Sequence, residues 1–232
     1  MVYIVQMLMT LKAELIIGDF IMAVNLLTGL SGICWSLVYI MMIYIGFKHK
    51  TYCMPLWAAG LNIAWELLYS ISNINTLGFA LPTVIHVFWF LLDIGVIACY
   101  FIYGKKYQIK DLQPYYILQG ITVILASFII EYAFYDALGA TNGSNYSAFS
   151  QNLLMSVLFI VMFFKRPNLE GQSLTIAIAK FIGTLAPTIL DGFILSYRFV
   201  TWIGLLCAVC DIAYIILVAL AKIDLHHAKT AQ

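Results

Sequence analysis

Long apolar runs, separated by short polar segments, make up almost the whole chain. A helix needs about 20 mainly apolar residues to cross the hydrocarbon core of a membrane. Runs of about that length cover residues 25–47, 54–72, 83–103, 115–135, 146–164, 173–192 and 199–221. The pattern predicts an all-α polytopic membrane protein, in which residues 1–232 form a single transmembrane domain, a bundle of seven transmembrane helices.

The two ends of the chain differ from these runs. Residues 1–20 are apolar but include Lys12, Glu14 and Asp19, which fits an interfacial helix or an extension of the first span. A cleaved signal is disfavoured, because no basic stretch precedes the apolar one. Residues 222–232 are more polar and are expected to form a cytosolic tail.

Basic residues occur in alternate connections between the runs. The first, third and fifth connections and the tail contain Lys48, Lys50, Lys105, Lys106, Lys110, Lys165, Arg166, Lys222 and Lys229. The second and fourth connections, at 72–82 and 136–145, contain no lysine or arginine. Because basic segments stay in the cytosol, the pattern predicts an outside or lumenal N-terminus and a cytosolic C-terminus. The membrane would be the endoplasmic reticulum in a eukaryote, or the inner membrane in a bacterium.

Composition narrows the classes of partner. The chain is 63% hydrophobic and 10% charged, whereas soluble domains are about 25% charged. A net charge of +1 gives no electrostatic case for nucleic acid binding. The five cysteines lie in or beside apolar runs and are assigned to packing, and no metal or cofactor is expected. The connections are short, so the lipid bilayer is the implied partner and no obligate protein partner is evident.

Several ionisable residues fall inside the apolar runs. They are Glu66, His86, Asp93, Glu131, Lys180, Asp191 and Asp211. A charged group in a membrane span costs roughly 2.5–3.5 kcal/mol on insertion scales, so each is a candidate functional residue. His86, Glu131 and Asp191 lie near expected helix ends, where they can reach water or headgroups. The deeper residues need partners or neutralisation, and Lys180 is expected to pair with Asp93 or Asp211.

Polar and aromatic side chains form stripes, because residues three and four apart share a helix face. Four expected helices carry such stripes: Asn62, Trp65, Glu66 and Tyr69; His86, Trp89, Phe90 and Asp93; Asn152 and Ser156; Cys207, Asp211 and Tyr214. Packed together, they would enclose a central pocket, with Glu66 and Asp211 within hydrogen-bond reach or one water apart. The alternative is that the amides and hydroxyls only join helices, at about 0.6 kcal/mol for each hydrogen bond.

The deep carboxyls indicate acid chemistry. Glu66 and Asp211 lie deep in their spans along with Lys180. At least one of the two acids is expected to be protonated, because burial and a nearby like charge disfavour the ionised form. A neutral carboxylic acid in an apolar pocket is a competent proton donor. Aromatic faces attract cations, so rings beside such an acid fit carbocation chemistry. The candidate rings are Trp65, Tyr69, Trp89 and Tyr214.

Taken together, several segments resemble the integral-membrane terpene cyclases of meroterpenoid and indole-diterpene biosynthesis, the pyripyropene-type and paxilline-type cyclases. The resemblance rests on KTYCMP at 50–55, NIAWELLY at 62–69, WFLLD at 89–93, YSAFSQNLLMS at 146–156, GQS at 171–173, KFIGTL at 180–185 and DIAY at 211–214. These blocks span nearly the whole chain and come in the family's order, whereas residues 1–20 match nothing in it.

The resemblance implies a reaction class. Members of the family cyclise a polyprenyl chain, usually one that bears a terminal epoxide and is attached to an aromatic or polyketide head. Two acidic residues are regarded as essential there, and by motif they correspond to Glu66 and Asp211. The soluble terpene cyclase signatures D-D-x-x-D and D-x-D-D are absent, so the resemblance implies no magnesium-bound diphosphate.

The resulting hypothesis is a class II-like cyclase, in which a proton starts the reaction of a prenylated or epoxyprenylated substrate. Glu66 would protonate the epoxide or terminal alkene, and Asp211 would tune that acid or take the final proton, although the two roles are interchangeable at this stage. The predicted substrate-binding residues are Asn62, Trp65, Tyr69, His86, Trp89, Asp93, Asn152, Ser156, Lys180 and Tyr214.

The alternative to a cyclase is a proton-coupled small-molecule transporter, since such pumps also use membrane carboxyls. A receptor or structural bundle is a third class.

Overall fold

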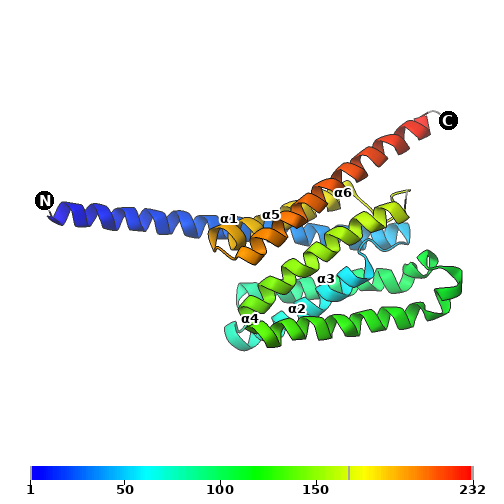
Figure 1. Ribbon diagram of the computed structural model, residues 1–232, viewed down its shortest axis with the longest axis horizontal. Helices are drawn as coiled ribbons and strands as arrows, with labels where there is room; N and C mark the ends of the chain where they lie inside the picture. The colour runs from blue at the N-terminus through cyan, green and yellow to red at the C-terminus, as the bar shows by residue number, and fades with distance from the viewer. Residues whose placement is uncertain (1, 167, 231–232) are drawn as a thin grey trace.

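The computed structural model describes residues 2–166 and 168–230, and within these ranges it is helical without any strand (Figure 1). The main helices are α1 (Val2–His49), α2 (Leu56–Leu77), α3 (Leu81–Tyr103), α4 (Tyr116–Lys165), α5 (Leu174–Pro187) and α6 (Arg198–Thr230). Short 3-10 segments η1 (Gly104–Tyr107) and η2 (Lys110–Tyr115) follow α3, and a π-helical segment, η3 (Thr188–Ile194), follows α5. The all-α prediction is confirmed.

The expected count of seven spans is not confirmed. Five segments of the described chain are long and apolar enough to cross a membrane: Ile17–His49, Thr83–Tyr107, Lys110–Lys165, Leu174–Ile194 and Arg198–Leu225. Helix α2 is not among them, because its asparagines and serines and Glu66 make it too polar. The runs expected at 115–135 and 146–164 both fall in α4. The coarser prediction of a helical membrane-spanning protein is confirmed.

Helix α4 is interrupted at Gly139, which explains how two expected runs share one element. Gly139 has φ 75° and ψ 174°, a backbone conformation that is essentially restricted to glycine. A Cβ placed on Gly143 would lie 2.8 Å from the carbonyl oxygen of Phe134, whereas residues nine apart in a straight helix are separated by roughly 13 Å. The chain therefore reverses, and α4 consists of two arms that meet at a sharp angle (Figure 1).

The N-terminal part of α1 projects beyond the other helices (Figure 1). Residues 2–20 continue into the expected first span as one helix without a break. From residue 17 onward most side chains of this projecting part are exposed and apolar, among them Ile17, Ile21 and Leu26. Such a surface is suited to lipid rather than water.

The core contains side chains from all six α-helices, among them the second half of α1. Val38, Tyr39 and Met42 of α1 are almost fully buried, as are the small residues Ala58 and Ala59 of α2. Small residues let helix backbones approach closely in a membrane bundle. This packing places the polar face of α2 inside the protein, next to α3 and α4.

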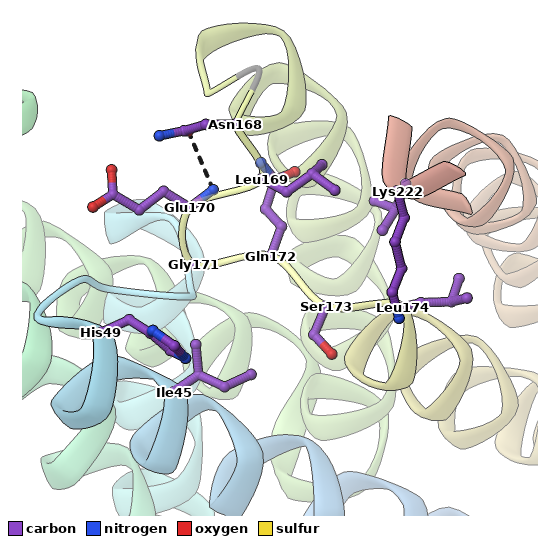
Figure 2. A pocket seen from close by; sticks show the side chains of 11 residues that line it. Ile45, His49, Asn168, Leu169, Glu170, Gly171, Gln172, Ser173, Leu174 and Lys222 are labelled. Atoms are coloured by element: carbon purple, nitrogen blue, oxygen red, sulfur yellow. Dashed lines mark hydrogen bonds between the residues drawn. The ribbon is translucent and has the colours of Figure 1, made fainter. Parts of the chain in front are cut away.

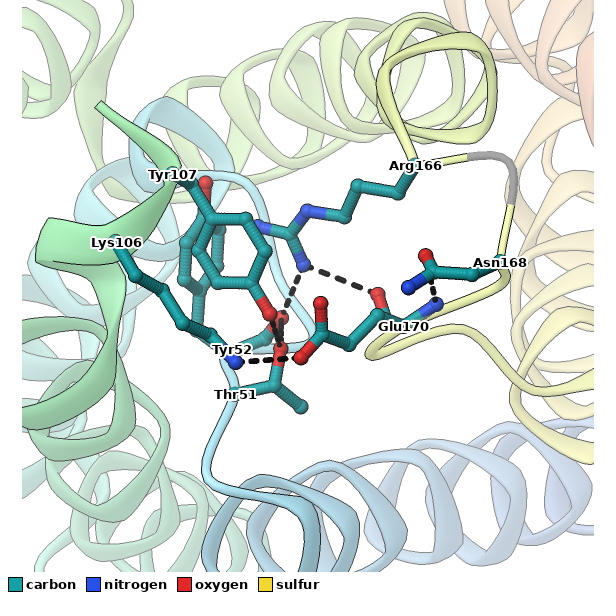
Figure 3. Close-up of polar contacts among 7 residues, drawn as sticks. All are labelled: Thr51, Tyr52, Lys106, Tyr107, Arg166, Asn168 and Glu170. Atoms are coloured by element: carbon teal, nitrogen blue, oxygen red, sulfur yellow. Dashed lines mark hydrogen bonds and ion pairs between the residues drawn. The ribbon is translucent and has the colours of Figure 1, made fainter. Parts of the chain in front are cut away.

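Three connections meet at one end of the bundle (Figure 3). The Arg166 guanidinium, at the end of α4, lies 4.0 Å from the ring centre of Tyr52 and 3.7 Å from that of Tyr107. It donates to the carbonyl oxygens of Tyr52 at 2.9 Å and Glu170 at 3.2 Å. Lys106 forms an ion pair with Glu170. The first, third and fifth connections, which carry most of the basic residues, are therefore tied together.

Candidate functional site

Glu66 is buried between α2 and α3. Only 3% of its surface is exposed. Its Oε2 atom lies 3.1 Å from Nδ1 of His86, and neither atom makes a well-aligned hydrogen bond. Within the described ranges, no lysine or arginine is paired with Glu66. Since a buried carboxylate without a cation is costly, the neutral acid is the favoured form of Glu66.

The position of His86 near a helix end suggested that it could reach the headgroups. Its ring instead packs against other aromatic side chains. Its ring stacks on Trp65 at 5.0 Å and 28°, and its other neighbour is Trp89 at 5.9 Å. The side chain of His86 is 18% exposed, against 4% for that of Glu66. Because Nδ1 is itself buried, the exposure belongs to the rest of the ring. The imidazole thus has one nitrogen beside the buried Glu66 carboxyl, while another part of its ring is exposed at the protein surface.

Asp93 is held by α2 rather than by a cation. The Asn62 side chain donates to Asp93 Oδ2 at 2.8 Å and to the hydroxyl of Tyr39. One turn before Asp93, Trp89 donates through Nε1 to Ser36 Oγ at 3.0 Å. These bonds join α1, α2 and α3 into one buried polar layer. Tyr39 belongs to that layer although the sequence analysis had not selected it.

Asp211 pairs with Lys180, which is one of the two pairings expected for that lysine. Lys180 Nζ lies 2.8 Å and 2.9 Å from the two oxygens of Asp211 and 2.7 Å from Ser156 Oγ. In the part of the chain that the structure describes, no hydrogen bond joins Asp211 to Glu66. The two carboxyls are therefore not directly hydrogen-bonded to each other, and both oxygens of Asp211 contact Lys180 instead.

A cavity of about 190 Å³ lies beside Glu66. Five of the predicted site residues line it, namely Asn62, Trp65, Glu66, Trp89 and Asn152. Nine further lining residues were not predicted for the site, among them Trp35, Tyr39, Gln151 and Asp191. The cavity is thus an aromatic container with carboxyl and amide groups in its wall, as acid-initiated carbocation chemistry requires.

The other predicted site residues lie behind this wall or away from it. His86 and Asp93 contact the lining residues Glu66 and Asn62. Ser156, Lys180 and Asp211 contact one another, and none of these five residues lines the cavity. Tyr69 packs on Trp65 at 5.0 Å, and Trp65 donates through Nε1 to the carbonyl of Ser144 at 3.1 Å. Tyr214 packs on Phe159 at 5.3 Å and donates to Gln172 at 3.3 Å.

Two of the lining residues that were not predicted, Trp35 and Tyr39, lie on the first expected span. That span contains no acidic residue, histidine, lysine or arginine, so buried charge gives no signal there. Their spacing with Ser31, four residues each, is the same helical stripe that identified the other sites. The position of Asp191 near an expected helix end indicates contact with headgroups or water, whereas the residue lines the cavity from η3.

A second and larger cavity, of about 590 Å³, lies at the end where the basic connections meet (Figure 2). The 168–174 connection forms much of its wall, together with His49 of α1 and Lys222 of α6. On α1 it begins at Ile45, six residues beyond Tyr39, which is roughly 9 Å along the helix. Its carboxyl, Glu170, is already paired with Lys106, so this cavity lacks the free buried acid of the first one.

The chain is similar to known proteins over most of its length. The model of the family described as Pyr4-like transmembrane terpene cyclases matches residues 19–223. A terpene cyclase, pyr4, of Aspergillus fumigatus is 28% identical over 199 residues, which cover 79% of this chain and 80% of that protein. The Pyr4-family terpene cyclase mfmH of Annulohypoxylon moriforme is 28% identical over 165 residues, covering 67% of this chain and 64% of that protein. Terpene cyclase andB of Emericella variicolor is 28% identical over 169 residues, covering 70% and 69%. No solved structure matches significantly.

Proposed function

Because this chain belongs to the Pyr4-like transmembrane terpene cyclases, we propose that it cyclises a prenyl or epoxyprenyl chain by class II-like chemistry that a proton initiates. The substrate we propose is a meroterpenoid precursor, in which the prenyl chain carries a polar head. The observation that carries the proposal is the position of Glu66, a buried acid without a cation in the wall of an aromatic cavity.

In this reaction Glu66 donates the first proton. The proton goes to the epoxide oxygen, the adjacent C–O bond breaks, and the π electrons of the nearest alkene form a new C–C bond. The positive charge moves to the other carbon of that alkene, and Glu66 is left as a carboxylate. Asp211 is less suited to this step, because both of its oxygens contact Lys180 and it does not line the cavity. We assign Asp211 and Lys180 to positioning the helices around the cavity.

The aromatic wall would stabilise the cationic intermediates. Trp35, Tyr39, Trp65 and Trp89 all line the cavity. A cation over an aromatic face gains roughly 0.5–2 kcal/mol, with the larger values in desolvated sites. His86, at 3.1 Å from Glu66, is placed to return a proton to it after each turnover.

For the membrane we propose seven spanning segments with the N-terminus outside or lumenal and the C-terminus in the cytosol. The reversal at Gly139 supports counting the two arms of α4 separately. The contacts of Arg166 with Tyr52 and Tyr107 support placing the first, third and fifth connections on one side. The membrane is the endoplasmic reticulum in a eukaryotic host, or the inner membrane in a bacterial one.

Membranes that contain the protein, supplied with an epoxyprenyl aromatic compound, test the proposed activity. The expected result is a cyclised product of unchanged mass, since the reaction is an isomerisation. Uptake of the unaltered compound into sealed vesicles would instead identify the proton-coupled transporter. The comparisons do not support that alternative, because the relatives named above are terpene cyclases.

A further inference from the structure

A second carboxyl, that of Asp191, lines the cavity of Glu66 from a different element. Glu66 comes from α2, whereas Asp191 comes from the π-helical segment η3, which directly follows α5. Asp191 is partly exposed, whereas Glu66 is buried. No lysine or arginine is paired with either carboxyl in the ranges that the structure describes.

The local backbone holds Asp191 in place. Pro187 has no N–H to donate, and after it the chain continues as a π-helix, in which the N–H of Leu195 donates to the carbonyl of Leu190 at 2.8 Å. The wider turn is fastened to the start of α6, because Thr201 Oγ1 donates to the carbonyl of Gly192 at 2.8 Å. Single π-helical turns occur frequently at functional sites.

Gly192 packs closely against the start of α6. A Cβ on Gly192 would lie 3.0 Å from the Cα of Thr201, which is tighter than most Cβ contacts. Asp191 is therefore carried by a turn that is bonded to α6 and packed against it. A rigid support is what a group needs if it must meet one particular atom of a bound substrate.

The two carboxyls of the cavity differ in burial. Burial without a cation favours the neutral form of Glu66. Asp191 is only partly buried, so its ionised form costs less than that of Glu66. Two carboxyls in one site that differ in this way are suited to act as an acid and a base. A carboxylate in this wall also attracts the positive charge that Glu66 generates.

We propose that Asp191 is the base that ends the cyclisation. The inference rests on the proposed function of Glu66. In the last step, a carboxylate oxygen of Asp191 takes the proton from the carbon next to the final cationic centre. The electron pair of that C–H bond becomes the π bond of the product alkene, and Asp191 becomes neutral. Glu66 lost one proton and Asp191 gained one, so the substrate is isomerised, and transfer through water resets both acids.

Asp211 cannot take this role in the present geometry. Both of its oxygens contact Lys180, and it is not among the residues that line the cavity. Glu131 is buried between α2 and α4 and also lies outside the cavity wall. Of the described acidic residues, Asp191 is therefore the one that shares the cavity with Glu66.

The test compares products from membranes containing the unaltered protein, Asp191→Asn and Asp191→Glu, with an epoxyprenyl aromatic compound as substrate. For Asp191→Asn we expect substrate consumption to continue while the ratio of alkene product to water-captured alcohol falls at least tenfold. The alcohol is identified by a mass 18 units above that of the alkene, because a water molecule adds to the final cation when no base removes its proton. Asp191→Glu keeps a carboxylate but moves it by one methylene, so it should still form mainly alkene, with a shifted double bond or at a reduced rate. Asp136→Asn, at an exposed carboxyl, is the matched control.

Two results would overturn the proposal. One is an unchanged ratio of alkene to alcohol in Asp191→Asn. The other is a complete loss of substrate consumption by Asp191→Asn protein that is extracted in normal amount and unfolds at the normal temperature, since the base acts only after the first ring closes. If Asp191→Asn does not accumulate, the double-bond position in the Asp191→Glu product decides: an unchanged product at the unaltered rate contradicts the proposal. Failure of the proposed function is distinct, because Glu66→Gln would then still consume substrate.

Discussion

Lys180 and Asp211 form a buried ion pair, in which Nζ lies 2.8 Å and 2.9 Å from the two carboxylate oxygens. Their side chains are 1% and 2% exposed. The pair distinguishes Asp211 from Glu66, although both acids lie deep in their expected spans. Asp211 is committed to a cation, while Glu66 has an imidazole as its close polar neighbour and retains access to the cavity.

The ion pair predicts a specific pattern of stability. Asp211→Asn or Lys180→Met alone leaves one buried charge without its partner, which should lower the free energy of unfolding by about 3–5 kcal/mol. The double variant Lys180→Met with Asp211→Leu removes both charges and should recover most of that loss. Thermal unfolding of detergent-solubilised protein measures the three variants. A double variant as unstable as the sum of the single ones would contradict the interpretation.

We expect Asp211→Asn also to lose most cyclase activity, because the helices around the cavity shift.

Glu66→Gln should stop catalysis without unfolding the protein. Glutamine has nearly the same shape as glutamic acid but has no acidic proton to give, and loss of a general acid costs typically 10²–10⁴-fold in rate. Product formation in membranes, measured at equal protein level, is the readout. Asp224→Asn, at an exposed carboxyl on α6, should have no effect and serves as the control. Full activity of Glu66→Gln would remove Glu66 from the role of acid.

His86→Phe should slow turnover while leaving substrate binding nearly intact. A phenyl ring can still stack on Trp65, which His86 contacts at 5.0 Å, but it cannot pass a proton to Glu66. We expect kcat to fall by about 10- to 100-fold, at the lower end of general acid–base effects, with KM changed less than threefold. A rise in KM at unchanged kcat would show that the ring only shapes the cavity. His49→Phe, at the distant second cavity, is the matched control.

Gly139→Ala should destabilise the reversal in α4. With φ at 75° and ψ at 174°, alanine at this position is strained by about 1–3 kcal/mol. Gly29→Ala is the matched control, because it lies in a regular helix and a Cβ there meets no atom within 4 Å. Thermal unfolding should show a lower midpoint for Gly139→Ala and an unchanged or higher one for Gly29→Ala. Equal midpoints for the two variants would mean that the reversal does not depend on glycine.

The protein should lose stability at low pH because of Glu170, which lies at the end of the bundle where the connections meet. Burial alone would raise the pKa of Glu170, but hydrogen bonds from Lys106 and Tyr107, together with the charges of Lys106 and Arg166, lower it below the ordinary value of 4.5. A lowered folded-state pKa contributes stability that is fully present above the unfolded pKa and is lost as pH falls through the folded one. We therefore expect part of the thermal stability to disappear as pH drops below about 4.5, the ordinary glutamate value.

Glu170→Gln removes that titrating group and should flatten this part of the pH dependence. The variant is expected to be less stable than the unaltered protein at neutral pH and to converge with it in acid. Asp111→Asn, at an exposed carboxyl of η2, is the control and should retain the full acid dependence. An unchanged slope in Glu170→Gln would show that another group is responsible.

The helical class, the membrane-spanning character and the family were all predictable from sequence. Apolar runs of sufficient length identify helices in lipid, because the backbone must satisfy its hydrogen bonds within each segment. The stripe containing Asn62, Trp65 and Glu66 placed these residues correctly in one wall, since helical spacing decides which side chains share a face. Lys180 was correctly limited to Asp93 or Asp211 as partner by the scarcity of deep charges.

Tertiary structure alone decided how the stripes face one another. Spacing within one helix says nothing about the rotation or depth of its neighbours, so sequence could not show that Lys180 reaches Asp211, or that His86 rather than Asp211 contacts Glu66. The same limit hid Asp191, because the π-helical turn after Pro187 brings an apparent helix end into the cavity wall. Residue type and position show which groups are costly to bury, whereas the packing between helices sets which of them are paired and which remain free to exchange a proton.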